Sequence, residues 1–203
     1  MGDFWEDAFK DKREMWGLLP AKSAELAKTY FVENNVRTLL IPGIGYGRNA
    51  QLFRDIGIAV TGIEISKTAI DLAHKHFGDD MKIHHGSVTK MPFDEQLYDA
   101  IFCYALIHLL DKAERINLIK DCYAQLSDNG VMVFTSITKN AQTCGQGKPI
   151  GKDRFEMFGG VKMFFYDKNT IEEEFEGAGL CEILEVIENY PFHFIKCRKL
   201  SSK

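Results

Sequence analysis

Short apolar runs alternate with amphipathic stretches along most of this chain. Strands are expected at residues 36–41, 58–65, 81–85, 98–104 and 131–137. Between these runs, apolar side chains recur at helical spacing. Continuously apolar strands that alternate with amphipathic helices are typical of a parallel sheet covered on both faces. The pattern therefore predicts an α/β fold of the doubly wound type.

Start residues mark two of the helices between these runs. Ser66 is a good N-cap for the helix that follows it. Asp111, with Glu114 three residues on, has the spacing of a capping box and opens another helix. The inner faces are expected to hold Ile70, Ala73 and Phe77 in the first helix and Ile116, Ile119, Tyr123 and Leu126 in the second, which Asn129-Gly130 closes.

The regular alternation stops between residues 138 and 166. Two short runs, 154–158 and 161–166, flank Gly159-Gly160 and predict a β-hairpin. The hairpin carries four phenylalanines and one tyrosine, which is more aromatic surface than an exposed loop needs. We therefore expect the insertion at residues 138–166 to be a substrate cover at the carboxyl ends of the strands, or alternatively a dimer surface.

The two ends of the chain complete the expected domain. Residues 180–187 and 192–197 lie close enough in sequence to form an antiparallel strand pair. Residues 3–16 mix charged side chains with large aromatic ones, which favours a helix packed onto the domain over a free tail. We expect a single domain over residues 1–203, with residues 1–35 as an N-terminal helical lid.

The composition narrows the classes of partner. With 203 residues, of which 45% are hydrophobic, the chain is long enough for one sizeable core and short for two. The net charge is −4 and there is no dense basic run, so nucleic acid is not expected as a main partner. No run of about 18 apolar residues occurs and the first residues lack a signal-peptide pattern, so no membrane partner is expected either.

Cysteine and histidine spacing give two further expectations. The five cysteines are odd in number, widely spaced and mostly in apolar runs, which fits reduced core thiols in a cytoplasmic protein. His84 and His85 face opposite ways on a strand, and His74 and His76 are two apart on a helix. No metal site is therefore expected.

Three glycines on alternate positions, Gly43, Gly45 and Gly47, follow the first apolar run. Glycine is used where the backbone needs positive φ, or where a Cβ would collide with a ligand. The helix expected after the loop directs unpaired N–H groups toward the same place. The loop therefore predicts either a ligand site or a tight strand-to-helix turn without a ligand.

An acidic residue at the end of the second strand favours the ligand interpretation. Glu64 lies 17 residues after Gly47, where adenosine cofactor sites use an acid to accept hydrogen bonds from the ribose. Arg48 stands where the third glycine of Gly-x-Gly-x-x-Gly would be, so the spacing disfavours NAD. The chain also contains no Tyr-x-x-x-Lys pair and no Gly-x-x-x-x-Gly-Lys phosphate loop.

These residues resemble a known family. Residues 39–47, Leu-Leu-Ile-Pro-Gly-Ile-Gly-Tyr-Gly, are similar to the first motif of class I S-adenosylmethionine-dependent methyltransferases. Further segments resemble the family's ribose-binding strand end, adenine-side loop, fourth strand and the turn into its fifth strand, at residues 63–66, 86–88, 98–101 and 126–130. The resemblance covers about residues 36–137. It implies a mostly parallel seven-stranded sheet that ends in an antiparallel strand pair.

A looser likeness concerns the branch of that family. The Pro-Gly-x-Gly variant, together with the opening from Trp5 to Gly17, is similar to the thiopurine methyltransferase and tellurite-resistance-like branches, which act on small molecules. Two positions depart from the family pattern. Ile41 stands where an acid is usual, and Ser87 stands where aspartate is common, so backbone carbonyls and a weaker acceptor would hold the cofactor's amino groups.

The resemblance also implies site residues. S-adenosylmethionine, with S-adenosylhomocysteine as its product, is expected to contact Gly43, Ile44, Gly45, Gly47, Asn49, Glu64, Ile65, Ser87, Val88, Tyr104 and Ala105. The substrate is expected to contact Trp16, Tyr46, His108 and Phe164.

Catalytic side chains are expected to be few, because a sulfonium already activates the methyl group and positioning supplies much of the rate. His108, after the fourth strand, is the candidate base for a hydroxyl, amine or thiol. Alternatively it only shapes the pocket or packs beside Leu109. The Tyr104 ring would flank the sulfonium and Trp16 would close the pocket, unless both are ordinary packing aromatics.

The predicted function is methyl transfer from S-adenosylmethionine to a small molecule by a monomer or homodimer. A non-catalytic module that binds the same cofactor is the main alternative. A nucleotide-linked oxidoreductase is a third, and Arg48 is the feature against it. The sequence leaves the acceptor and its attacking atom open.

Overall fold

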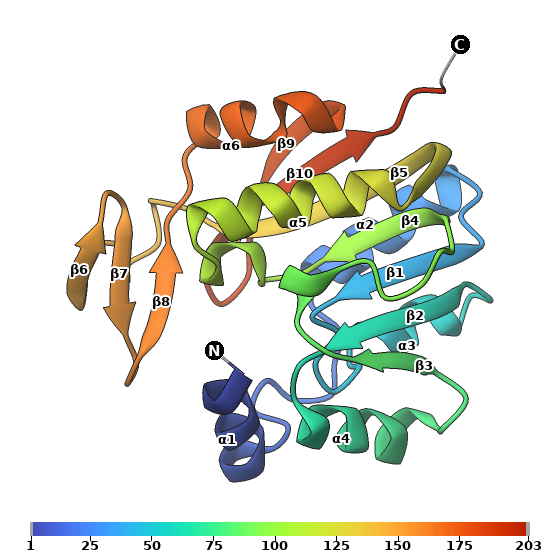
Figure 1. Ribbon diagram of the computed structural model, residues 1–203, viewed down its shortest axis with the longest axis horizontal. Coiled ribbons are helices and arrows are strands. Elements are labelled where there is room, and N and C mark those ends of the chain that lie inside the picture. The colour runs from blue at the N-terminus through green and yellow to red at the C-terminus, as the bar shows by residue number, and fades with distance from the viewer. Residues whose placement is uncertain (1, 202–203) are drawn as a thin grey trace.

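The computed structural model describes residues 2–201, so the outermost residues of the expected domain, residue 1 and residues 202–203, lie outside the described part. Seven strands form one sheet in the order β3 (Lys82–His85), β2 (Ala59–Glu64), β1 (Thr38–Pro42), β4 (Tyr98–Cys103), β5 (Leu126–Ile137), β10 (Pro191–Arg198) and β9 (Leu180–Ile187) (Figure 1). The pairs among β1 to β5 are parallel, whereas β10 is antiparallel to both of its neighbours. The expected mostly parallel sheet with an antiparallel C-terminal pair is confirmed.

Helices cover both faces of the sheet. The helices are α1 (Gly2–Lys12), α2 (Lys22–Glu33), α3 (Ala50–Arg54), α4 (Lys67–Phe77), α5 (Lys112–Ala124) and α6 (Lys168–Phe175), with short 3₁₀ turns η1 (Val88–Lys90), η2 (Ile107–Leu109) and η3 (Glu176–Ala178). Buried side chains of α2, α3 and α4 share one core cluster, and those of α5 and α6 share another on the opposite face. In Figure 1, α5 and α6 lie in front of the sheet. No helix within residues 2–201 has the length and apolar character needed to cross a bilayer.

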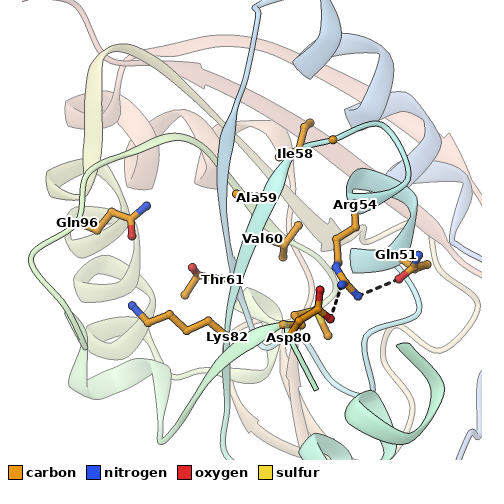
Figure 2. A pocket seen from close by; sticks show the side chains of 11 residues that line it. Gln51, Arg54, Ile58, Ala59, Val60, Thr61, Asp80, Lys82 and Gln96 are labelled. Carbon is orange, nitrogen blue, oxygen red and sulfur yellow. Dashed lines mark hydrogen bonds and ion pairs between the residues drawn. The ribbon is translucent and has the colours of Figure 1, made fainter. Parts of the chain in front are cut away.

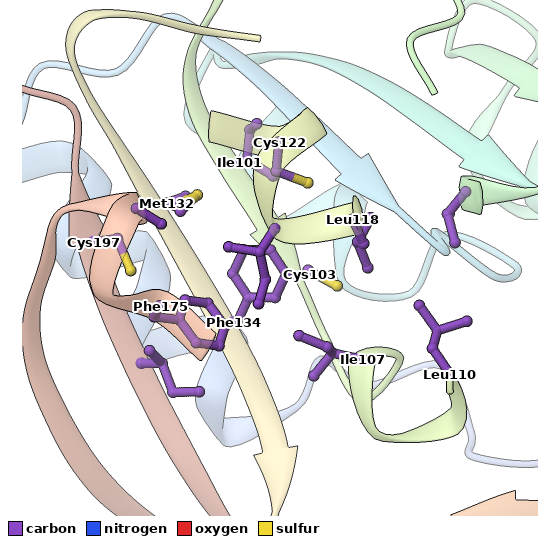
Figure 3. Close-up of a cluster of buried hydrophobic side chains, with 14 of the residues drawn as sticks. Ile101, Cys103, Ile107, Leu110, Leu118, Cys122, Met132, Phe134, Phe175 and Cys197 are labelled. Atoms are coloured by element: carbon purple, nitrogen blue, oxygen red, sulfur yellow. The ribbon is translucent and has the colours of Figure 1, made fainter. Parts of the chain in front are cut away.

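Strands β4 and β5 are apolar on both sides because one face packs beneath α5 and α6 and the other beneath α2 and α3. Figure 3 shows Cys103 of β4 and Phe134 of β5 between Leu118 of α5 and Phe175 of α6. The Phe134 and Phe175 rings meet edge to face, with their centroids 5.2 Å apart. Fully buried side chains of this size contribute about 1.5 to 3 kcal/mol each, so these contacts fix the two strands that lead into the site.

Helix α5 begins as the sequence predicts, but its buried face differs. Asp111 and Glu114 form a complete capping box. Ile116, expected on the inner face, is 43% exposed, and Arg115 takes the inner position because its guanidinium pairs with Glu174 of α6. The helix ends at Ala124, before the expected Asn129-Gly130 stop, because residues from Leu126 onward already pair with β4.

The face of α4 is also shifted from the expectation. Ala69, Leu72 and Ala73 are its buried residues, whereas Ile70 and Phe77 are only half-buried. The small alanines allow α4 to approach the glycine loop closely. A Cβ built on Gly47 would lie 3.4 Å from the Ala73 Cβ, which is ordinary contact, and 3.1 Å from the Phe77 ring.

The insertion forms a small sheet of its own. Its strands are β6 (Lys148–Gly151), β7 (Arg154–Met157) and β8 (Val161–Phe164), all antiparallel, and Figure 1 shows them beside the carboxyl ends of the main strands. The hairpin of β7 and β8 is confirmed. Strand β6 was not expected, because its exposed sequence with Pro149 and Gly151 lacks an apolar pattern.

Candidate functional site

The site is built where neighbouring strands lead to opposite faces of the sheet. Strand β1 continues into α3 on one face, and its neighbour β4 continues through η2 into α5 on the other. In open α/β sheets this switch point leaves a crevice at the carboxyl ends of the strands, where ligands bind. The glycine loop follows β1, and the turn at residues 104–106 follows β4, so both expected site segments meet there.

The glycine loop is bound to the end of β2 through its backbone. Gly43 and Gly45 have φ of +69° and +58°, which an L side chain rarely adopts. The N–H groups of Gly43 and Ile44 both donate to the Ile63 carbonyl, at 2.8 and 3.1 Å. The Gly45 N–H donates to Oε2 of Glu64 at 2.8 Å. The structure therefore brings the loop and the candidate ribose acceptor into direct contact.

Glu64 is a buried carboxylate held by backbone donors. Its residue is 6% exposed, and its Oε1 accepts from the N–H groups of Ile65 and Ser66 at 2.8 and 2.9 Å. Burial raises the pKa of the Glu64 carboxyl, although the three backbone hydrogen bonds oppose that rise. A carboxylate has about four acceptor positions, so a fourth remains for a hydroxyl of a ligand.

Two of the expected cofactor residues use their side chains for packing. Ile44 is buried against Gly62, where a Cβ would lie 2.6 Å from its Cδ1. The Oδ1 of Asn49 accepts from the Ala21 N–H at 2.9 Å and so fixes the chain just before α2. Ile44 is therefore left with its backbone to face a ligand, and the Oδ1 of Asn49 is already occupied.

The expected adenine-side residues lie beside Glu64. The Gly86 N–H donates to the Glu64 carbonyl at 2.8 Å, so the loop that carries Ser87 and Val88 is tied to the end of β2. The Ser87 hydroxyl caps η1 and pairs with the Thr89 hydroxyl at 2.8 Å, and Val88 is buried. Ile65 is half-buried and lies next to the start of α1. A Cβ built on Gly2 would lie 3.2 Å from the Ile65 Cδ1.

The turn after β4 faces the glycine loop. Ala105 adopts φ of +50°, and Leu106 follows it onto Gly43, where a built Cβ would lie 3.0 Å from Leu106 Cδ2. The Tyr104 hydroxyl donates to Oε2 of Glu188 at 2.7 Å. Burial and the carboxylate of Glu188 both raise the pKa of Tyr104, so its hydroxyl stays protonated.

His108 lies on η2 and is 4% exposed. Its Nδ1 accepts from the Ile137 N–H at 3.4 Å, and its ring lies 6.1 Å from that of Phe192. Burial alone lowers the pKa of His108 to about 3, so the imidazole is neutral at physiological pH. Proton acceptance by this ring is disfavoured, and its role as a base stays a prediction.

The N-terminal segment packs onto the glycine loop. The Trp16 ring stacks on Tyr46 at 6.2 Å, and the buried Tyr46 donates its hydroxyl to the Gly17 carbonyl at 2.7 Å. Glu6 of α1 accepts from the hydroxyls of Ser66 and Thr68, each at 2.7 Å, and these bonds lower its pKa to about 2. Trp16 and Tyr46 therefore lie together, and Trp16 remains 46% exposed.

Phe164 lies in a different environment from those two aromatics. Its ring packs under the Arg115 guanidinium, 3.9 Å from the ring centre, and edge to face with Tyr166 at 4.9 Å. Several other apolar side chains of the insertion instead join those of η2, β5, β10 and α1 in one cluster, which includes Trp5, Leu109, Ile137, Phe155, Met157, Met163, Phe165 and Phe192. The insertion therefore reaches the site mainly through this cluster, which we call the insertion cluster.

Sequence reasoning missed four residues that support the site. Glu6 and Glu188 are acids in polar segments, Thr135 is followed by a second hydroxyl residue, Ser136, in a mostly apolar run, and Leu106 is one of many leucines. Their partners are far away in sequence; Glu188, for example, is 84 residues from Tyr104. A buried hydroxyl in a central strand is the one signal that could have marked Thr135.

A separate hollow lies at the other end of the sheet. It measures about 590 Å³ and is lined by the first residues of β2 and β3 and the end of α3. Figure 2 shows its charged side chains, of which Arg54 pairs with Asp80 at 2.6 Å. Lys82 pairs with Asp94 at 2.8 Å. Its two cations are therefore already paired with carboxylates. Among residues 2–201 no group of three or more His, Cys, Asp or Glu side chains is arranged to hold a metal ion.

Sequence comparison identifies a domain type and a relative. Residues 40–134 match the family model described as a methyltransferase domain. A ubiquinone biosynthesis O-methyltransferase of Coxiella burnetii is 25% identical over 145 residues, which are 68% of this chain and 58% of that protein. The chain therefore matches less than two thirds of the length of this curated relative.

Solved structures share the fold. The 1,6-didemethyltoxoflavin-N1-methyltransferase of Burkholderia thailandensis, with bound 1,6-didemethyltoxoflavin and S-adenosylhomocysteine, superposes with a TM-score of 0.76 at 13% identity, over 98% of this chain and 87% of that one. An S-adenosylmethionine-dependent methyltransferase of Clostridium acetobutylicum gives 0.75 at 13% identity, over 98% and 99%. At these identities the likeness establishes a common fold.

Proposed function

We propose that this chain is a class I S-adenosylmethionine-dependent methyltransferase and that it transfers a methyl group from S-adenosylmethionine to a small-molecule acceptor. One observation carries the proposal: the buried Glu64 carboxylate receives the Gly45 N–H at 2.8 Å and keeps an acceptor position for a ribose hydroxyl. Gly45 itself is open, since a Cβ there would meet only the Phe9 ring within 4 Å. These two features fit an adenosine group.

The residues of the chain would hold and orient the cofactor rather than act on it chemically. When bound, S-adenosylmethionine supplies a methyl group that is already activated on a sulfonium. Glu64 would accept from the ribose, and the loop with Ser87 would border the adenine. Tyr104 and Ala105 would form the wall nearest the sulfonium. Positioning of this kind supplies several kcal/mol of a barrier without a dedicated base.

An apolar and uncharged acceptor suits the other wall. The insertion cluster consists of apolar side chains, and the nearby His108 is neutral because its pKa is about 3. A charged acceptor would lose its hydration there without gaining an ion pair. The acceptor nucleophile would form its bond to the methyl carbon, the carbon–sulfur bond would break with its electrons going to sulfur, and the acceptor's proton would leave to water.

Two segments are proposed as covers. Residues 1–35 would act as a lid, because Glu6, Phe9 and Trp16 rest on α4 and the glycine loop. The insertion at residues 138–166 would cover the acceptor, because its apolar side chains meet Trp5 and η2. A cytoplasmic location, in a monomer or homodimer, completes the proposal and is supported by the buried free thiols of Cys103, Cys122 and Cys197.

Thermal unfolding with S-adenosylhomocysteine and with NAD, measured side by side, tests the proposal. S-adenosylhomocysteine at a hundred times its Kd should stabilise the protein by about 2.7 kcal/mol, whereas NAD should not shift the midpoint. A shift with NAD alone would contradict the proposal and favour an oxidoreductase.

A methyl-transfer screen against a metabolite library then separates an enzyme from a binding module. Release of S-adenosylhomocysteine with at least one neutral apolar acceptor is expected. Cofactor binding without turnover on any acceptor would favour the non-catalytic alternative.

A further inference from the structure

We propose that Thr135 is a positioning residue of this site: its hydroxyl holds Ala105 in the left-handed backbone conformation and so sets the turn that faces the glycine loop. The inference rests on the proposed function, because the turn at residues 104–106 is the wall assigned to the cofactor. Thr135 itself lies one strand away, on β5, and is placed to act only through Ala105.

Ala105 has a backbone conformation that needs outside support. Its φ of +50° brings Cβ close to the following carbonyl, so residues other than Gly, Asn and Asp rarely adopt it. Strained residues of this kind persist when their surroundings fix them, and they concentrate at functional sites. Something near Ala105 must therefore favour the strained conformation over the ordinary one.

The Thr135 hydroxyl provides that support. The parallel pairing of β4 with β5 ends at Cys103 and Phe134, so the sheet offers no further ladder partner beyond this point. The next residue of β5 is Thr135, and its Oγ1 accepts from the Ala105 N–H at 2.8 Å. A side chain thus replaces the missing ladder bond at the place where the chain turns away.

Thr135 is a rigid anchor. It is fully buried, and its backbone pairs with Phe194 of β10 on the side away from β4. A buried hydroxyl in an apolar strand costs free energy unless it is hydrogen-bonded, so the bond to Ala105 also accounts for the presence of threonine here. Valine has the same shape but cannot accept a hydrogen bond.

The conformation of Ala105 decides what reaches the glycine loop. It directs Leu106 onto Gly43, where a built Cβ would lie 3.0 Å away, and it starts η2, which carries His108. On the other side Tyr104 is held independently by Glu188, which also accepts from the Ser23 N–H at 2.7 Å. If Ala105 returned to negative φ, the wall between Tyr104 and Leu106 would move while the glycine loop stayed in place.

Two substitutions of Thr135 separate the effect of its hydroxyl from the effect of its side-chain shape. Thr135→Val removes the acceptor and keeps the volume, whereas Thr135→Ser keeps the acceptor and loses a methyl group. In calorimetric titration with S-adenosylhomocysteine, Thr135→Val should weaken binding about tenfold and Thr135→Ser should stay within about twofold of the wild type. Hydrogen exchange of the Ala105 amide should be at least about tenfold faster in Thr135→Val and near the wild-type rate in Thr135→Ser.

A double-mutant cycle tests the role of strain. Glycine adopts positive φ without penalty, so Ala105→Gly should reduce the dependence on the hydroxyl. In the Ala105→Gly background, Thr135→Val should weaken S-adenosylhomocysteine binding by about threefold or less. If the effect stays tenfold in that background, the hydroxyl does not act by holding Ala105, and the inference is wrong.

The remaining outcomes are also decisive. If Thr135→Val and Thr135→Ser bind S-adenosylhomocysteine equally, whether both tightly or both weakly, the hydroxyl has no positioning role. If the Thr135→Val variant does not fold, the inference is tested by adding Ala105→Gly, which should restore folding in the double variant. If the wild type binds no S-adenosylhomocysteine, the proposed function fails instead, while the exchange rates still report on the Thr135 bond.

Discussion

The two halves of the site are built in different ways. The cofactor half consists mainly of backbone groups from residues near each other in sequence, such as the Gly45 N–H and the Glu64 carboxylate, which are 19 residues apart. The acceptor half consists of side chains from distant segments. The insertion cluster, for example, joins Trp5 of α1 with Phe155 of the insertion and Phe192 of β10.

This difference explains where the family likeness lies. A backbone-built site restricts the sequence locally, because positive φ and close approach call for glycine and the ribose calls for an acid. The matched methyltransferase domain, residues 40–134, contains this half and excludes both α1 and the insertion. The side chains that line the acceptor half can change in type while the wall keeps its shape. This half therefore sets which acceptor binds, and the sequence pattern shared with the family lies in the cofactor half.

The strongest test of this contrast is to disrupt the support of the acceptor half. The Arg115 and Glu174 side chains are 3% and 5% exposed, and Arg115 also packs on Phe164 of β8. Arg115→Met leaves Glu174 buried and unpaired, which should lower the free energy of unfolding by about 3 to 5 kcal/mol in urea titration. Lys120→Met, on the exposed side of α5, should change it by less than about 0.5 kcal/mol.

The affinity for S-adenosylhomocysteine should stay within about threefold in Arg115→Met, because that variant leaves the glycine loop intact. A loss of less than about 1 kcal/mol in stability would show that the ion pair does not support this half.

The second largest expected effect is the loss of folding stability that His108 causes as the pH falls. Its folded pKa of about 3 lies below the ordinary 6.5, so the folded state binds fewer protons and the neutral ring favours folding. That contribution is complete above pH 6.5 and is lost as pH falls from 6.5 toward 3. The loss between pH 7 and pH 5 is about 2 kcal/mol, and His108→Gln should remove this part of the pH dependence in urea titrations at the two pH values.

The exposed His85 supplies a matched control on another element. His85→Gln should keep the wild-type loss of stability between pH 7 and 5. An unchanged loss in His108→Gln would mean that His108 is not buried in its neutral form.

The cofactor half should show its own pH dependence through Glu64. Its carboxyl pKa is raised by burial, and only the ionised form offers all its acceptor positions to a ribose. The affinity for S-adenosylhomocysteine should therefore be lower at pH 5 than at pH 7.5, because protonation of the Glu64 carboxyl removes acceptor positions. Glu64→Gln should bind weakly at both values in calorimetry, and a wild-type affinity that does not change with pH would contradict the assignment.

The smallest effect concerns the contact of α1 with the rest of the site. Glu6 accepts from Ser66 and Thr68 at the start of α4, but its side chain is partly exposed. Glu6→Gln should cost less than about 1 kcal/mol and should speed hydrogen exchange in α1 more than in α4. Asp7→Asn, on the exposed side of the same helix, is the control and should leave exchange unchanged.

The same contrast accounts for what the sequence could predict. The parallel strands, the glycine loop and the position of Glu64 at the end of the second strand follow from local patterns, and the structure has them as expected. The inner face of α5 was predicted incorrectly at Ile116, because the buried Arg115 is explained only by Glu174 on another helix. Strand β6 was not predicted, because its pairing with β7, rather than an apolar pattern of its own, makes it a strand.

The limit of what the sequence can predict is clearest in the acceptor half. Phe164 was expected to meet the substrate, but the hydrophobic pattern could not reveal that its ring lies under Arg115. On the cofactor side, the supports of the turn at residues 104–106 by Thr135 and Glu188 likewise depend on β4, β5 and the β9–β10 turn coming together. Long-range side-chain contacts of this kind leave no periodic signal in the sequence.

Calorimetric titration of S-adenosylhomocysteine into the wild type, Glu64→Ala and Glu33→Ala tests most directly whether the glycine loop and Glu64 form the cofactor site. Glu33 is an exposed acid at the end of α2 and serves as the control. The wild type and Glu33→Ala should bind alike, and Glu64→Ala should bind at least about tenfold more weakly, because hydrogen bonds to a buried carboxylate are lost. An unchanged affinity in Glu64→Ala would contradict the assignment of this site to the cofactor.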